Sequence, residues 1–113
     1  MSTSEIATVL AWHDALNAKD LTTLVDLSSD DIEIGDAHGA AQGLQALQTW
    51  AQGVTEAVTV GRLYVHEGIV VAEQGDRASA FRVVNDQVTS VFRHPDLASA
   101  LNATDLTEDD LDA

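Results

Sequence analysis

The hydrophobic residues in the first half of the chain recur with the period of a helix. A first helix is predicted over residues 2–17, because its apolar face follows the spacing i, i+3, i+4, i+7 and i+10: Ile6, Val9, Leu10, His13 and Leu16. Asp20 is a suitable N-cap for a short second helix over residues 21–27. A third helix is predicted after Gly43, with four side chains on one face: Leu44, Leu47, Ala51 and Val54.

A short strand is predicted between the second and third helices, over residues 31–36. Successive side chains of a strand point to opposite faces, so Ile32, Ile34 and Asp36 share one face and the apolar side of the strand ends in a carboxylate. Two interpretations stay open. Asp36 is either a turn residue that accepts hydrogen bonds from loop amides, or an acid at the rim of an apolar cavity.

From Val58 onward the hydrophobic period changes to two. Residues 58–94 are predicted to form four strands, joined by tight turns at HEG (66–68), QGD (74–76) and ND (85–86). Connections this short require antiparallel neighbours. A helical turn is predicted after Pro95 and Asp96. The tail over residues 104–113 has five acids in ten residues and is expected to fray.

The order of these elements predicts one α+β domain over residues 1–113, in which three N-terminal helices pack on a curved antiparallel sheet. His13 lies within the first apolar face. It is either a core histidine that a carbonyl or a water satisfies, or an imidazole directed into a cavity. Trp12 and Trp50 lie at the edges of the helical apolar faces and are expected in the core or in a pocket wall.

Charge and composition exclude several classes of function. Five Lys+Arg against 19 Asp+Glu give a net charge of -14, so simple phosphate neutralisation on nucleic acid or an anionic membrane is not expected. The chain has no cysteine, and its four histidines show neither HxH nor HxxxH spacing, so no metal and no cofactor are expected. The absence of cysteine and of an apolar run near 20 residues fits a cytoplasmic protein.

Three segments carry a resemblance to a known family: DALNAKDLTTLVDLSSDDIEI, QGLQALQTW and FRVVNDQVTSVFRHPDLASAL. With the order helix, short helix, strand, helix and meander, the chain resembles the nuclear transport factor 2-like superfamily. Its SnoaL-like and ketosteroid-isomerase-like members are the most similar. The resemblance spans nearly all 113 residues. It implies a cystatin-like cone that holds a small apolar molecule, and a homodimer formed through the sheet.

The resemblance also implies roles for individual residues. Asp36 falls where ketosteroid isomerases carry the carboxylate that moves a proton, since residues 20–39 match that family's segment without a gap. The isomerases' helix-one tyrosine corresponds to Trp12 by a gap-free count and to His13 by the phase of the apolar face. We use the phase, because a pocket residue must lie on the buried face. The isomerases' second acid corresponds to Ser79, which can donate a hydrogen bond but is a much weaker acid.

Three functional hypotheses follow from the resemblance. The first is a binder of a small apolar molecule, with Asp36 and His13 as polar anchors and five lining residues: Trp12, Ile34, Trp50, Ser79 and Phe81. The second is an isomerase, lyase or hydrolase in which Asp36, with His13, transfers a proton. The third is a dimerisation module, in which Tyr64, Val84 or Phe92 would be partly exposed in a single chain.

Overall fold

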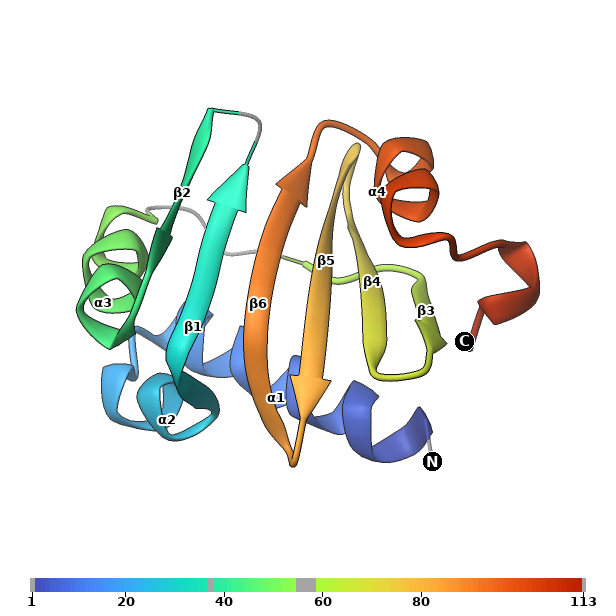
Figure 1. Cartoon of the computed structure of the whole chain (residues 1–113). Coiled ribbons are helices and arrows are strands. Elements are labelled where there is room, and N and C mark those ends of the chain that lie inside the picture. Colours follow the sequence, from blue (N-terminus) through green and yellow to red (C-terminus); the bar gives the residue numbers. More distant parts are fainter. Residues whose placement is uncertain (1, 37, 55–58, 113) are drawn as a thin grey trace.

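The computed structural model describes residues 2–36, 38–54 and 59–112. It contains six strands, four α-helices and one 3-10 turn within those ranges (Figure 1). In chain order they are α1 (Ser2–Ala18), α2 (Leu21–Asp26), β1 (Ser28–Asp36), β2 (Gly39–Gln42), α3 (Leu44–Gly53), β3 (Leu63–His66), β4 (Ile69–Gln74), β5 (Arg77–Val84), β6 (Gln87–His94), α4 (Leu97–Thr104) and η1 (Glu108–Asp110).

The three predicted N-terminal helices are confirmed, with one change in the buried face of the first. Asp20 caps α2 as expected, and its side chain accepts a hydrogen bond from the backbone N–H of Thr23. In α1, however, Leu10 is 38% exposed whereas Trp12 is fully buried. The sheet therefore meets α1 on a face turned toward Trp12 and Ala15, because the bulky indole fills more of the core than Leu10 would.

The six strands form a single sheet in the order β2-β1-β6-β5-β4-β3. The predicted four-strand antiparallel meander is confirmed as β3 to β6, although its first strand begins at Leu63 and Val58 lies outside the described residues. Two features were not predicted. β1 runs parallel to β6, so the sheet is not wholly antiparallel, and the short strand β2 pairs with β1 as a hairpin.

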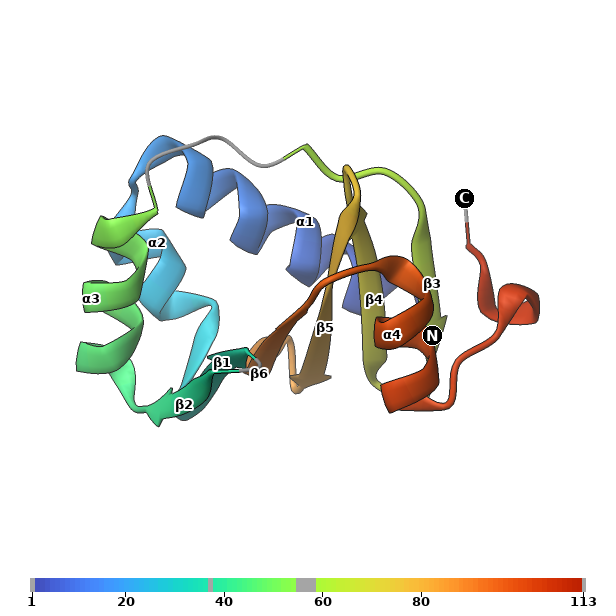
Figure 2. The same cartoon turned by 90° about the horizontal axis from the view of Figure 1, so that it is seen from above.

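The sheet curves around α1, and α1, α2 and α3 all lie on its concave side (Figure 2). The main core fills that side: Val9, Trp12, Leu16, Leu24, Ile32, Leu47, Val70, Phe81 and Val91 are among its fully buried or nearly fully buried members. Lys19 fastens the end of α1 to the end of α3, since its ammonium donates to the carbonyls of Ala51 and Val54. The predicted cone is therefore present, with helices on one face and the sheet as its wall.

The convex side of the sheet is partly covered by the chain's own C-terminal segment. α4 contacts β4, β5 and β6, and a second core forms beneath it from Tyr64, Val71, Ala78, Ala80, Ala100 and Leu106. Tyr64, Val84 or Phe92 was expected to be partly exposed, and of these Val84 is 49% exposed whereas Tyr64 is fully buried. The tail is not frayed either: the Tyr64 hydroxyl donates to Glu108 Oε2 at 3.0 Å, and the Asp112 N–H donates to the Leu63 carbonyl at 2.8 Å.

Candidate functional site

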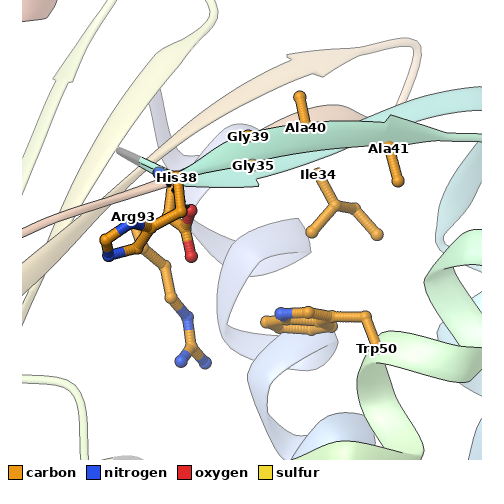
Figure 3. Close-up of a pocket in the computed structure, with 9 residues that line it drawn as sticks. Ile34, Gly35, His38, Gly39, Ala40, Ala41, Trp50 and Arg93 are labelled. Atoms are coloured by element: carbon orange, nitrogen blue, oxygen red, sulfur yellow. Dashed lines mark hydrogen bonds between the residues drawn. The ribbon is translucent and has the colours of Figure 1, made fainter.

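A hollow lies on the concave side of the β1–β2 hairpin, between the hairpin and α3 (Figure 3). Its volume is about 340 Å³, which falls at the lower end of the ~300–1,000 Å³ typical of small-molecule pockets. Nine residues line it: Ile34, Gly35, Asp36, His38, Gly39, Ala40, Ala41, Trp50 and Arg93. The lining is thus mainly small or apolar, with one carboxylate and one guanidinium.

Small side chains in the hairpin create this hollow. Ile34 and Ala41 are cross-strand partners, and both point toward Trp50, while Ala40 points to the opposite face (Figure 3). Ala41 stops well short of the indole, so a gap stays open between the hairpin and α3. Gly35 is required for a different reason, because a Cβ there would lie only 2.6 Å from Phe92 Cε1 on the convex face.

Asp36 lies at the rim of the hollow, where β1 ends. Its side chain is exposed, and Oδ1 accepts a hydrogen bond of 2.8 Å from the backbone N–H of His38. This contact is the turn-capping role that the sequence left open. Asp36 also belongs to the lining of the hollow.

Arg93 was missed by the sequence interpretation. It lies on β6 opposite Ser79, and its guanidinium carbon is 4.8 Å from the centroid of the Trp50 ring. Burial and the positive charge of Arg77 both lower the pKa of Arg93, while Asp36 acts in the opposite sense. The available signal was the period of two along β6, which places Val91 and Arg93 on the same, concave face.

Trp12, His13 and Phe81 form a compact group in the core, which we call the aromatic cluster. The ring centroids of Phe81 lie 5.5 Å from Trp12 and 5.2 Å from His13, both in edge-to-face geometry. The Trp12 ring also lies 5.8 Å from the Trp50 ring. Trp50 therefore lies between the hollow and the aromatic cluster. It lines the hollow, and its ring neighbours the Trp12 ring of the cluster.

His13 is only 3% exposed and is held by a short chain of polar side chains. Gln74 Nε2 lies 3.1 Å from His13 Nε2, and the Ser79 hydroxyl donates to Gln74 Oε1 at 2.8 Å. Because Gln74 Oε1 accepts from Ser79, the Gln74 Nε2 amide group donates to His13 Nε2. The neutral imidazole therefore carries its proton on Nδ1. Nδ1 is buried and has no hydrogen-bond partner. Burial, and to a lesser extent the charge of Arg93, lowers the pKa of His13 to about 4, while Asp14 opposes this shift.

The structure brings only some of the predicted site residues together. Ile34, Asp36 and Trp50 meet at the hollow, whereas Trp12, His13, Ser79 and Phe81 are not in its lining and lie deeper in the core. Within the described residues, no hydrogen bond or ion pair joins His13 to Asp36. Across the same ranges, no group of three or more histidine or acidic side chains is arranged to hold a metal ion. No helix in the described part of the chain has the length and hydrophobicity to cross a membrane.

Solved structures share this arrangement of a bent sheet with helices on its concave side. An NTF2-like protein from Burkholderia xenovorans is 20% identical, with a TM-score of 0.72 over 92% of this chain and 98% of that one. An LEH-like epoxide hydrolase from M. tuberculosis is 18% identical, with a TM-score of 0.73 over 89% of each chain. The chain has the nuclear transport factor 2-like fold.

A third solved structure is similar to this chain in the same way. An NTF2-like protein of unknown function from Cytophaga hutchinsonii is 13% identical, with a TM-score of 0.74 over 81% of this chain and 89% of that one. No family model and no curated protein sequence matches the chain. At identities this low the NTF2-like likeness concerns the fold, and the activity must be argued from the site.

Proposed function

We propose that this chain binds a small, largely apolar molecule in the hollow beneath the β1–β2 hairpin. The observation that supports this is the composition of the wall: Ile34, Ala41 and the Trp50 ring offer apolar surface, while Asp36 and Arg93 offer polar groups at one side. Pockets that select one small molecule typically combine these two kinds of surface. The NTF2-like fold adds support, because one of the similar structures is described as an LEH-like epoxide hydrolase.

Proton transfer by Asp36 with His13 is the alternative that the sequence raised. It has less support than binding, because the two residues are not joined and Asp36 already caps the turn at His38. The low pKa of His13, about 4, leaves its imidazole neutral near pH 7, and the ring is enclosed by Trp12 and Phe81. The dimerisation module has no observation that favours it over a ligand site.

Native mass spectrometry tests the proposal directly. Protein purified from the organism that encodes it should retain a small molecule, and Ala41→Leu should abolish retention because the longer side chain fills the space facing Trp50. Ala7→Leu is the matched control, since it adds the same volume at an exposed position of α1 outside the lining of the hollow. Equal retention by the two variants, or no retained molecule and no binding in a thermal-shift screen of small apolar compounds, would contradict the proposal.

We also propose that two chains associate through the part of the convex face that α4 does not contact. Phe92 is partly exposed there, and its ring lies against Gly35 on the neighbouring strand. An apolar side chain exposed on a sheet face is suited to a two-fold contact between chains. Light scattering should give twice the 12.0 kDa of one chain, and Phe92→Arg should halve that mass. Leu10→Arg, at an exposed apolar position on α1, is the control and should leave the mass unchanged.

A further inference from the structure

Arg93 is the only guanidinium in the lining of the hollow, and its surroundings are apolar on one side. Its charged group stacks against the Trp50 ring, with the guanidinium carbon 4.8 Å from the ring centroid. Figure 3 shows Arg93 and Trp50 reaching into the same space from opposite sides. Stacking on an aromatic face holds the planar guanidinium in place while its edge N–H groups stay available.

No carboxylate of the described residues neutralises Arg93. Ion pairs within 4.0 Å are found for Arg62 with Glu73, at 3.5 Å, and for His66, but not for Arg93. Asp36 influences the pKa of Arg93 only from beyond that distance. Since the chain has 19 acidic and only five basic residues, a partly buried arginine without an acidic partner is unexpected. A partly desolvated charge that lacks an internal partner is suited to a partner from solution.

A second arginine strengthens the positive charge at this place. Arg77 lies two residues before Ser79 on β5, and Ser79 is the cross-strand partner of Arg93, so Arg77 is the diagonal neighbour of Arg93 on the concave face. Arg77 is not in the lining of the hollow, but its positive charge acts on Arg93 and lowers the pKa of that guanidinium. Counted with Asp36, the one carboxylate of the described lining, the two arginines leave a positive local balance in a protein whose net charge is -14.

From this geometry we propose that the natural ligand is a small amphipathic carboxylic acid whose carboxylate is bound by Arg93 and whose apolar body lies against Trp50 and Ile34. This inference rests on the proposed function and specifies the class of ligand. The flat guanidinium fork matches a planar carboxylate through two parallel N–H···O bonds. The distal carbon chain or ring then fills the gap between Ala41 and Trp50.

The charges around Arg93 also discriminate against other head groups. A cationic ligand would meet Arg93 and Arg77 directly. A dianionic phosphate would be repelled by Asp36 and by the strongly negative protein, and it would need more donors than one stacked guanidinium supplies. A monoanion is the species whose charge Arg93 can balance while Asp36 accepts a hydrogen bond from a hydroxyl elsewhere on the ligand.

Isothermal titration calorimetry with matched pairs of compounds tests the assignment. The probes are straight-chain and phenyl-substituted carboxylic acids of four to ten carbons, each compared with its primary alcohol. At least one acid should bind tenfold or more tightly than its alcohol, and the difference should shrink as salt is raised. Arg93→Gln should weaken binding of the acid at least tenfold more than binding of its alcohol, which removes the preference. Arg82→Gln is the matched control, because Arg82 is exposed on the same sheet and is not in the lining.

The outcomes separate this inference from the proposed function. If acid and alcohol bind equally and Arg93→Gln changes neither, the carboxylate assignment is wrong while the pocket proposal stands. If an acid is preferred equally by the parent chain and by Arg93→Gln, the anion is bound elsewhere, and the assignment is again wrong. If no probe of either kind binds and the protein retains nothing in native mass spectrometry, the pocket proposal itself fails.

Discussion

The two ends of the cone's concave side differ in how completely side chains fill them. At the β4–β5 end, Val70, Ala72 and Phe81 are at most 1% exposed and pack beneath α1. At the β1–β2 end, all four residues of β2 are exposed and a hollow of about 340 Å³ remains. The same sheet and the same layer of helices serve both ends. Side-chain volume decides the difference, because Phe81 and Trp12 meet in van der Waals contact where Ala41 and Trp50 leave a gap.

This comparison shows where the fold derives its stability and where it has room for a ligand. The closed end buries large side chains, which contribute about 1.5–3 kcal/mol each on burial. At the open end β2 is exposed along its whole length and is held by pairing with β1, which in turn pairs with β6. Substitutions at the two ends should therefore separate effects on stability from effects on binding.

The largest effect is expected from Phe81→Ala at the closed end. The side chain is 1% exposed and is enclosed by Trp12 and His13, so truncation leaves a cavity that the rings cannot fill. The free energy of unfolding should fall by about 3–5 kcal/mol in urea denaturation. A loss below about 1 kcal/mol would mean that the aromatic cluster is loosely packed.

The second effect is a pH dependence from His13. Its pKa is lowered from 6.5 in the unfolded chain to about 4 in the fold, so the unfolded state binds more protons between these values. The stability that neutral His13 contributes is complete above about pH 6.5 and is lost as the pH falls through 4. The loss should amount to at most about 3 kcal/mol.

Carboxylates also lose stabilising contacts in acid, so a matched variant isolates the contribution of His13. The difference in unfolding free energy between the parent chain and His13→Gln should shrink from pH 7 to pH 4, because only the parent has the imidazole to protonate. A difference that stays constant over this range would show that His13 keeps its ordinary pKa in the fold.

The third prediction compares the same substitution, alanine to leucine, at the closed end and at the open end. Ala72→Leu adds volume at a fully buried position and should destabilise the fold by about 1–3 kcal/mol. Ala41→Leu adds the same volume toward the hollow and should change the free energy of unfolding by less than about 0.5 kcal/mol. Thermal denaturation of both variants measures the contrast. Equal losses would mean that the hollow is closed in solution.

The smallest effect concerns a glycine of the open end. In Gly35→Ala the new Cβ would lie 2.6 Å from Phe92 Cε1 and 3.0 Å from Ala40 Cβ, so the ring must shift, at a cost of about 1 kcal/mol. Gly53→Ala is the control, because nothing lies within 4 Å of a Cβ built there. The double variant Gly35→Ala with Phe92→Leu should recover part of the loss. A neutral Gly35→Ala would show that Phe92 moves freely.

Much of the fold could be predicted because local signals agreed with it. The turns of the meander fall at residues that tolerate positive φ: Glu67 at 48°, Gly68 at 83°, Gly75 at 65°, Asn85 at 52° and Asp86 at 63°. Alternating apolar residues then define the strands between those turns. β2 has no such signal, since GAAQ consists of small and polar residues that give no strand preference, and only pairing with β1 makes it a strand.

Less of the candidate site than of the fold could be predicted from the sequence. Three of the predicted site residues, Ile34, Asp36 and Trp50, lie in the wall of the hollow, because the strand period and the helix face place them there; that they bind a molecule stays a prediction. The period of two along β6 was enough to place Arg93 on the concave face, but not to show that it meets Trp50, because Trp50 comes from a distant part of the chain. His13 was assigned to the buried face correctly, but its depth depends on how closely Phe81 and Gln74 approach across the cone.

The parallel pairing of β1 with β6 has a consequence for synthesis. Ile34 aligns with Val91, so among the strands of the described residues the one that connects the β1–β2 hairpin to the rest of the sheet, β6, is translated after all the others. The hairpin, with α3 against it, cannot join the sheet until β6 has left the ribosome. Contacts between such distant residues slow folding, since a long loop must close before they form. The wall of the hollow is therefore completed last: a chain stopped before β6 has eight of the nine lining residues and lacks Arg93.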